Sequence, residues 1–282
     1  MKKVVAFLLA IVTACSIGAF ATGCSDDAIL VQTNAFFAPF EYYDGSEIVG
    51  VDVDIMERVG EKMGKEVKFQ DGDFGIIIQT VSEGKTADVG AAGLTITDER
   101  KQYVDFSIPY YTSVQYVIWD ESDTSFTTQT AADGTTEIVL WENLKGKKIG
   151  VQIDTTGNIY VAGEINKDEG FDGVLYDSGA TVSTQENAQL AVEAMYGSLD
   201  LDCVVVDKLP AEYLVANTKN HQLKCAALYY DAETATEEQY AICVTPGKTE
   251  LLDAINSVLE EMIENNEIDK LVQKHLGLTE NN

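Results

Sequence analysis

Residues 87–100 of the chain read ADVGAAGLTITDER, which joins a short apolar run to a polar turn. The apolar run predicts a strand, and the last four residues, TDER, predict the start of a helix. Upstream, residues 28–34 and 67–70 also predict strands, while residues 53–64 and 75–84 predict amphipathic helices. This alternation of strand and helix predicts an α/β fold with a largely parallel sheet.

The second half of the chain repeats this pattern after a polar stretch at residues 121–137, which we expect to be a flexible surface excursion and not a core element. Predicted strands and helices alternate over residues 144–153, 155–165, 173–177, 184–197, 202–207 and 208–218. Two β segments, residues 225–230 and 239–246, precede two closing helices that are broken at Asn265-Asn266. Two similar α/β halves predict two lobes, and open α/β sheets bind ligands at the carboxyl ends of their strands.

The length and composition narrow the classes of function. At ~150 residues per domain, 282 residues correspond to about two domains, and a hydrophobic content of 45% is enough to bury a sizeable core. The chain has 19 Lys and Arg against 47 Asp and Glu, which gives a net charge of −28. Such a surface repels phosphate backbones, so we expect no nucleic-acid partner and no direct adhesion to an anionic membrane.

The N-terminus predicts export. Lysines at positions 2 and 3 precede an uncharged stretch, residues 4–25, that is long enough to cross a bilayer. A retained membrane anchor and a cleaved signal both fit this stretch, and the small residues near its end favour the signal. The tetrapeptide ATGC, which ends at Cys24, resembles a bacterial lipobox, in which the cysteine is lipidated and becomes the new N-terminus. We therefore expect residues 1–23 to be a lipoprotein signal peptide, and the mature protein to be held at the outer face of the cell membrane by acyl chains such as palmitate.

Three further cysteines, Cys203, Cys225 and Cys243, form no CxxC pair, so the sequence has no zinc or redox motif. Their odd number allows at most one disulfide, for which Cys225 and Cys243 are the better pair. Three buried thiols that pack as small hydrophobic side chains are the favoured interpretation.

Motifs for catalysis are absent from the sequence. It contains no HExxH, GxSxG, P-loop or GxGxxG pattern, and its two histidines, His221 and His275, lie in unrelated segments. Asp52 and Asp54 stand two residues apart at a strand-to-helix entry, where we expect them to cap the helix. We therefore expect a protein that is not an enzyme and that has no metal or cofactor site.

Polar side chains at two predicted helix starts offer an anion site. Thr97 is a natural N-cap, but Arg100 in the first turn opposes the helix dipole, at a cost of about 0.3–1 kcal/mol when exposed. Arg100 either clamps a carboxylate, with the Thr95 hydroxyl as a further donor, or pairs with a neighbouring surface acid. In the second half, Thr155 and Thr156 follow a strand just where a helix begins, and they either bind an anion or cap that helix.

Two further features suit a ligand site. Asp207 ends a predicted strand, where its carboxylate either receives an ammonium group or caps the next helix. Phe36, Phe37 and Phe40 follow the first strand, and Phe74 follows another. Core packing is the default for any one aromatic, but a loop at the carboxyl end of a strand also suits an aromatic wall over a ligand.

Residues 33–55, 73–111 and 146–161 resemble, in this order, the extracytoplasmic solute-binding proteins of polar amino-acid ABC importers. The most specific stretch is GLTITDERKQYVDFSIPYY at residues 93–111, and the similarity extends over about residues 29–278. The resemblance implies a two-lobe, periplasmic-binding-protein-like clamp, in which each lobe is a mostly parallel sheet flanked by helices.

The same resemblance implies the lobe boundaries and the site. The first lobe would comprise residues 24–114 and 236–282, and the second residues 115–235, with crossover strands near residues 110–114 and 236–240. Relatives use the equivalents of Arg100 for the ligand α-carboxylate, of Asp207 for the α-ammonium, and of Phe37 and Phe74 to flank the ligand side chain. The implied site residues are Asn34, Phe37, Phe74, Gly93, Thr95, Arg100, Gln152, Thr156 and Asp207.

Three departures from the family pattern bear on specificity. Asn34 stands where several relatives, including binders of cationic side chains, have Asp. Ala92 replaces a Ser of some relatives, and Val206 stands where glutamine binders can have His. Because a neutral Asn34 removes one partner for a cationic head group, we expect a neutral polar amino acid such as glutamine or cysteine.

The expected function is thus a lipid-anchored, monomeric binding protein that captures an L-amino acid by hinge closure and delivers it to the membrane permease of an ABC importer. One rival is a dehydratase of prephenate-like cyclic acids on the same fold, which would need a general acid or base in the cleft. A second rival is a ligand-sensing subunit, which would need a separate output partner, because the chain ends at LGLTENN just after its last predicted helix.

Overall fold

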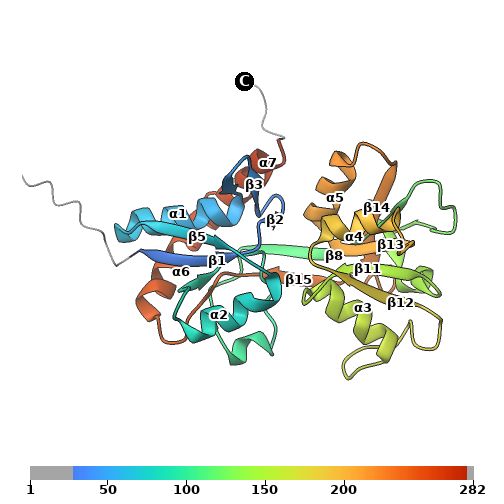
Figure 1. Cartoon of the computed structure of the whole chain (residues 1–282), viewed down its shortest axis with the longest axis horizontal. Helices are drawn as coiled ribbons and strands as arrows, with labels where there is room; N and C mark the ends of the chain where they lie inside the picture. The colour runs from blue at the N-terminus through green and yellow to red at the C-terminus, as the bar shows by residue number, and fades with distance from the viewer. Residues whose placement is uncertain (1–27, 278–282) are drawn as a thin grey trace, which may run out of the picture.

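The computed structural model describes residues 28–277 of the chain. The expected signal peptide, residues 1–23, and the expected lipidation site, Cys24, lie outside these described residues. Figure 1 shows two α/β lobes next to each other, with long strands running between them. The predicted α/β class and two-lobe arrangement are confirmed.

The first lobe is built on a five-stranded mixed sheet. Its strands are β1 (Ile29–Thr33), β5 (Val67–Asp71), β6 (Val89–Gly90), β7 (Asp105–Phe106) and β16 (Cys243–Val244). They lie in the order β5-β1-β6-β16-β7. β1 is parallel to both of its neighbours, whereas β16 is antiparallel to both of its own. A small separate sheet contains β2 (Phe36–Phe37), β3 (Glu41–Asp44) and β4 (Glu47–Val49).

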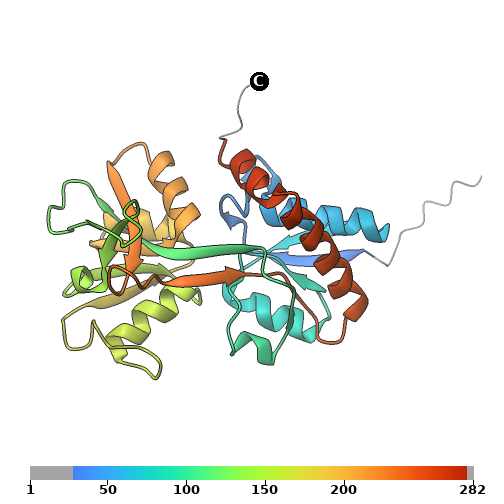
Figure 2. The ribbon, with the colours of Figure 1, turned by 180° about the vertical axis from the view of Figure 1, so that it is seen from behind.

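Four α-helices cover this sheet. They are α1 (Val51–Met63), α2 (Ile77–Glu83), α6 (Thr249–Glu264) and α7 (Glu267–His275). In α1, Val51, Ile55 and Val59 recur every four residues and are all fully buried, so this stripe faces the core. α6 buries Ile255 and Leu259 in the same cluster. Figure 2 shows α6 and α7 crossing the back of this lobe.

The second lobe has a larger mixed sheet in the middle of the chain. Its strands are β8 (Tyr111–Asp120), β9 (Gln129–Thr130), β10 (Glu137–Leu140), β11 (Lys148–Gln152), β12 (Thr181–Gln185), β13 (Cys203–Asp207) and β14 (Leu223–Tyr229). They lie in the order β12-β11-β13-β8-β14-β10-β9. Its α-helices are α3 (Thr156–Asn166), α4 (Ala188–Met195) and α5 (Lys208–Asn217).

Two strands connect the lobes. The first residues of β8, Tyr111 to Val114, pair antiparallel with β15 (Glu237–Tyr240), and the rest of β8 joins the second sheet between β13 and β14. Figure 2 shows β8 in green and β15 in orange crossing together from one lobe to the other. The strands lie near the crossover positions that the resemblance implies.

Two predicted elements are wrong. The helix expected to open at TDER is a single 3-10 turn, η2 (Arg100–Gln102), because Val104 is buried and the chain enters β7 directly afterwards. The strand expected over residues 173–177 is a turn, in which Gly173 has a φ of 72° and Leu175 fills the core. The neighbouring strand begins later, at Thr181.

The polar stretch at residues 121–137 is mostly exposed, as expected, but one prediction about it is wrong. Phe126 is buried and stacks on Trp119, with ring centroids 5.3 Å apart. The stretch also contains β9, which pairs with β10. It is therefore attached to the second core instead of being a loose excursion.

The cysteines are free thiols. Cys225 lies on β14 in the second lobe and Cys243 on β16 in the first, so the pairing considered from the sequence is not formed. Cys203 and Cys243 are buried, and burial raises the pKa of the Cys243 thiol to about 12. The favoured interpretation, buried thiols that pack as small hydrophobic groups, is confirmed for these two, while Cys225 is half-buried.

Within residues 28–277, none of the helices combines the length and the apolar character needed to cross a membrane.

Candidate functional site

Residues from both lobes surround a cavity beside the crossover strands. Its free volume is small, about 10 Å³. Its lining residues are Asn34, Phe37, Phe74, Gly93, Thr95, Gln152, Thr155, Thr156 and Asp207. Eight of the nine residues implied by the family pattern therefore meet at one place. The ninth, Arg100, donates a hydrogen bond to the backbone of Thr95, and Thr155 is an addition.

Arg100 is held inside the protein by neutral acceptors. Its Nη1 donates to the carbonyl oxygen of Thr95 at 2.8 Å, and its Nη2 donates to the carbonyl oxygen of Asp154, in the other lobe, at 3.2 Å. The guanidinium carbon lies 5.4 Å from the centre of the Phe74 ring. Burial lowers the pKa of Arg100, although nearby acids oppose this. Within residues 28–277 no carboxylate forms an ion pair with Arg100, so the alternative of a surface ion pair does not hold.

Thr155 and Thr156, the two threonines after β11, have different hydrogen-bond partners. The Thr155 side chain caps α3 by accepting from the amide of Asn158 at 3.4 Å. The Thr156 hydroxyl instead donates to Thr95 Oγ1, in the first lobe, at 2.8 Å. A hydroxyl from each lobe thus lies at the α3 N-terminus, where helix amides favour an anion.

A second contact between the lobes lies on the side of Asn34. Gln152 Nε2 donates to Asn34 Oδ1 at 3.0 Å, and Asn34 Nδ2 donates to the carbonyl oxygen of Gly72 at 2.9 Å. The buried Gln152 Oε1 has no hydrogen-bond partner within the described part of the chain. This end of the cavity therefore presents a neutral hydrogen-bond acceptor.

Asp207 occupies the opposite end. It is buried at the end of β13, and although it precedes α5 its carboxylate makes no capping hydrogen bond. It accepts a hydrogen bond from the Tyr240 hydroxyl. Burial raises the pKa of Asp207 well above its ordinary value, and the neighbouring carboxyl of Glu238 raises it further. The capping alternative is therefore wrong, and the acid is available to a cationic group.

Gly93 is fixed by a residue whose predicted role is wrong. Its φ is 52°, and a Cβ at this position would lie 2.7 Å from the Phe37 ring, so the position requires glycine. Its amide donates to Asp52 Oδ2 at 2.9 Å, and the Tyr110 hydroxyl donates to Asp52 Oδ1 at 2.5 Å. Asp52 thus positions the Gly93 loop instead of capping α1, whose first amides bond to carbonyl groups. Asp54 does not cap α1 either, since it binds Lys274 and His275.

Of the four phenylalanines considered from the sequence, one packs in the core, two line the cavity and one is exposed. Phe40 is fully buried and packs edge-on against Tyr240, with centroids 5.1 Å apart. Phe37 and Phe74 line the cavity, whereas Phe36 is 46% exposed. The histidines lie elsewhere: His221 stacks on Tyr196 in the second lobe.

Two residues that bind lining residues of the cavity were not predicted from the sequence. Glu238 Oε2 accepts from Thr95 Oγ1 at 2.5 Å, and Tyr240 binds Asp207 as described. Both stand on β15, two residues apart, so their side chains share one face of this strand. The spacing of polar side chains in TEEQY was an available signal, but it identifies a site only once β15 is known to cross the cleft.

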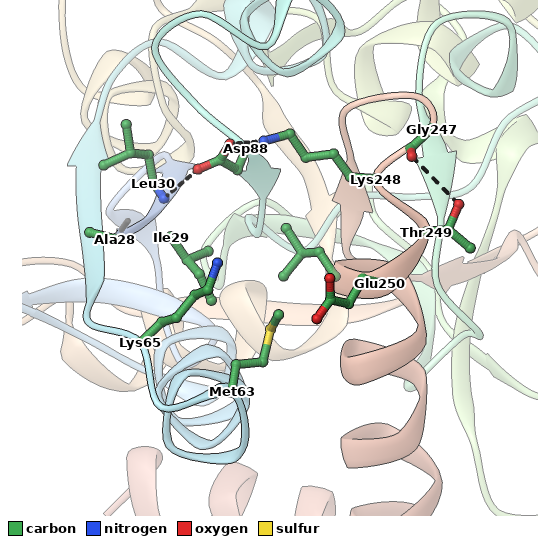
Figure 3. A pocket seen from close by; sticks show the side chains of 11 residues that line it. Ala28, Ile29, Leu30, Met63, Lys65, Asp88, Gly247, Lys248, Thr249 and Glu250 are labelled. Atoms are coloured by element: carbon green, nitrogen blue, oxygen red, sulfur yellow. Dashed lines mark hydrogen bonds and ion pairs between the residues drawn. The ribbon is translucent and has the colours of Figure 1, made fainter. Parts of the chain in front are cut away.

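A larger cavity lies away from this site (Figure 3). It measures about 560 Å³ and lies between the amino end of β1, the end of α1 and the start of α6. Two of its charges are paired: Lys248 binds Asp88, which also accepts from the amide of Leu30 at 2.9 Å. It contains none of the residues implied by the family pattern. Nor do three or more His, Cys, Asp or Glu side chains gather as a metal site anywhere in residues 28–277.

Known proteins are similar to this chain over nearly its whole length. Residues 29–278 match the family model described as "Bacterial extracellular solute-binding proteins, family 3". The arginine-binding extracellular protein ArtP of Bacillus subtilis is 30% identical over 97% of this chain and 98% of its own length. A probable histidine-binding protein of Neisseria gonorrhoeae is 28% identical over 88% of this chain and 82% of its own length.

Solved structures give the same result. An ancestral arginine-binding protein bound to glutamine is 33% identical, with a TM-score of 0.71 over 89% of this chain and 98% of that one. A mutant of ArgBP from T. maritima is 31% identical, with a TM-score of 0.70 over 89% of this chain and 95% of that one.

Proposed function

Since the chain belongs to the bacterial extracellular solute-binding proteins of family 3, we propose that it captures an L-amino acid between its two lobes and delivers it to an ABC importer. One observation carries this proposal. A buried arginine without an ion pair and a buried carboxylate lie at one cavity between two lobes. A zwitterion bearing an α-carboxylate and an α-ammonium complements both charges at once.

In the proposed complex, Arg100 and the hydroxyls of Thr95 and Thr156 hold the α-carboxylate. Asp207 receives the α-ammonium, and Phe37 and Phe74 enclose the side chain. Because these groups come from both lobes, ligand contacts favour the conformation in which the lobes meet. The hydrogen bonds from Thr156 to Thr95 and from Gln152 to Asn34 support the same conformation.

For the ligand side chain we favour a neutral polar group, with glutamine as the first candidate and cysteine as a smaller alternative. The cavity wall around Asn34 consists of two amide side chains and two aromatic rings. Gln152 Oε1, which has no partner among the described residues, suits an amide N–H donor. No carboxylate lines this end of the cavity within the described residues.

A cationic ligand is the second candidate, because ArtP and the ancestral protein bear names that refer to arginine binding. Gln152 Oε1 and the Phe74 ring also suit a guanidinium, although without charge neutralisation. The ancestral protein in its glutamine-bound form shows that one related site accommodates glutamine.

Calorimetry on protein that has been unfolded and refolded to remove bound ligand tests the proposal. We expect an amino acid from a full panel to bind with 1:1 stoichiometry, with glutamine tighter than arginine and lysine. Mass spectrometry of ligand that co-purifies with the native protein gives an independent identification. A panel in which no amino acid binds would contradict the function, and tighter binding of arginine would contradict only the side-chain assignment.

The remaining parts of the proposal concern the whole protein. We propose lipidation at Cys24, a monomer, and lobes comprising residues 24–114 with 236–282 and residues 115–235. Mass spectrometry of the mature N-terminal peptide tests the first: we expect an acylated cysteine, and Cys24→Ser should release the protein from the membrane fraction.

The proposed binding step requires no proton transfer to or from the ligand, so we assign no dehydratase activity. A ligand-sensing subunit would use the same capture step, and it differs only in its partner. Co-purification with a permease, as opposed to a signalling protein, distinguishes these two. Turnover of a prephenate-like acid by the purified protein would contradict the assignment as a binding protein.

A further inference from the structure

Glu238 stands on one crossover strand, β15, and binds both Gln115 on the other crossover strand, β8, and Thr95 at the cavity. It is buried on β15, with only 5% of its surface exposed. Its Oε2 accepts from the Thr95 hydroxyl and its Oε1 accepts from Gln115 Nε2 on β8, each at 2.5 Å. Thr95 in turn accepts from Thr156 at 2.8 Å. These four side chains form one chain of hydrogen bonds through both lobes.

Glu238 also lies beside Asp207, which lines the cavity, so two buried acids are neighbours here. Burial, and then the adjacent Glu238, raise the pKa of Asp207 well above its ordinary value, so Asp207 holds a proton in the ligand-free protein. Titratable and charged groups face this pair from the surrounding elements; they are Arg100, Tyr240, Tyr111, Tyr160 and Glu41.

The charges do not balance if both acids are ionised when the ligand is bound. Arg100 offsets the ligand carboxylate, and the ligand ammonium offsets Asp207. A second ionised acid, Glu238, would then remain buried without a counter-charge, which is unfavourable.

The direction of the hydrogen bonds leads to the same conclusion. The Thr95 hydroxyl has one proton, and here it donates that proton to Glu238. In this arrangement Thr95 has no proton for a ligand carboxylate. If Glu238 carries the proton, it donates to Thr95, and Thr95 then donates to the ligand. Gln115 continues to donate to the other oxygen of Glu238.

We propose that Glu238 is a positioning residue that is protonated in the ligand complex and orients the Thr95 hydroxyl toward the ligand α-carboxylate. This inference rests on the proposed function. On binding, the proton of the acid pair moves from Asp207 to Glu238 as the ammonium approaches Asp207, so no proton is exchanged with solvent. At higher pH, where Asp207 has lost this proton, binding takes one up, and affinity falls as pH rises.

The test compares wild type, Glu238→Gln and the control Glu237→Gln by calorimetry between about pH 5 and about pH 9. The probes are L-glutamine and L-arginine. Glu237 is the exposed neighbour on β15, so its variant loses the same formal charge without touching the site. Each titration is repeated in two buffers of different ionisation enthalpy, which counts the protons taken up on binding.

We expect the wild-type Kd to rise about tenfold per pH unit above the titration of Asp207, with about one proton taken up. Glu238→Gln, whose amide donates to Thr95 permanently, should not lose affinity as pH rises. Because this variant has no acid to receive the Asp207 proton, binding should instead release that proton to solvent at pH values where Asp207 is protonated. Glu237→Gln should follow wild type.

Three results would overturn this inference and leave the proposed function intact. They are a wild-type Kd that does not change with pH, a Kd of Glu238→Gln that rises with pH as steeply as that of wild type, and a folded Glu238→Gln that binds neither probe at any pH. If neither probe binds wild type at any pH, the proposed function fails and the inference fails with it.

Discussion

The two cavities of this protein differ in the pairing of their charges as well as in their size. The cavity at α6 is about 560 Å³, and its principal charges, Lys248 and Asp88, neutralise each other. The cavity between the lobes is smaller, but Asp207 lines it and Arg100 binds its lining residue Thr95, and both are buried without ion pairs among the described residues. A buried guanidinium without a counter-charge, and a buried acid whose pKa is raised, are costly to folding and are typical of functional sites.

The comparison is tested most directly by removing one cation from each cavity. Arg100→Ala should weaken amino-acid binding by about 100- to 1,000-fold, because the charge-assisted clamp on the carboxylate is lost. Lys248→Ala, the matched variant in the larger cavity, should leave Kd unchanged and cost no more than about 1 kcal/mol of stability. Calorimetry gives Kd, and thermal unfolding checks both folds. If both variants changed Kd equally, the two cavities would not differ in their contribution to ligand binding.

The buried acids should make the free energy of unfolding decrease as pH rises. Burial raises the pKa of Asp52 to about 6, and it raises the pKa values of Glu41 and Asp207 well above their ordinary values. The folded protein therefore holds more protons than the unfolded chain above about pH 4, and its stability falls as pH rises. For Asp52 alone, the loss between about pH 4 and pH 7 is about 2 kcal/mol.

Glu41 gives the variant for this measurement, because both of its carboxyl oxygens are buried without hydrogen-bond partners among the described residues. Glu41→Gln should stabilise the protein by about 1–3 kcal/mol at about pH 8 and have little effect at about pH 4. Denaturant unfolding across this range measures the difference. Glu47→Gln, an exposed acid on β4, is the control, and the same pH-dependent gain in both would refute the explanation.

A substitution at Asn34, where the site has no charged group, should have a smaller effect on ligand binding. Asn34→Asp should shift preference from glutamine toward arginine by about 10- to 100-fold, because a carboxylate there forms a charge-assisted hydrogen bond with a guanidinium. The ratio of the two Kd values measures the shift, with the exposed Asn217→Asp on α5 as the control. An unchanged ratio would place the ligand side chain elsewhere.

The smallest expected effect concerns contact between the lobes. Thr156→Val removes the hydroxyl that donates to Thr95 and should weaken binding about 3- to 10-fold. Thr249→Val in the α6 cavity, where the hydroxyl donates to the Gly247 carbonyl oxygen of its own turn, should have no effect on Kd. Calorimetry distinguishes the two, and equal values would mean that the contact with Thr95 contributes nothing to binding.

Much of this site could be predicted because it depends on local sequence. Strand ends followed by polar turns identified Thr95, Thr156 and Asp207, and their positions at the carboxyl ends of strands brought them together. The order of strands and helices was likewise predictable from apolar periodicity.

The errors arise where tertiary contacts decide. Asp52 is in the first turn of a helix, which suggests capping, but it reaches across to the Gly93 loop. TDER has good helix-starting residues, but β7 and the buried Val104 end the turn at once. Glu238 belongs to the site only because β15 pairs with β8, a contact between residues more than 120 positions apart, as in its bond to Gln115.

The position of β16 has a consequence for how the protein is assembled after synthesis. This strand comes from residues 243–244, yet it lies between β6 and β7 in the middle of the first sheet. The strands from β8 to β14 are complete once residue 229 has emerged, so the second lobe can fold while the rest of the chain is still in transit. The first lobe begins the chain but is the last to be finished. Until residues 243–244 are in place, the edges of β6 and β7 that β16 joins stay unpaired, and unpaired strand edges promote misassembly.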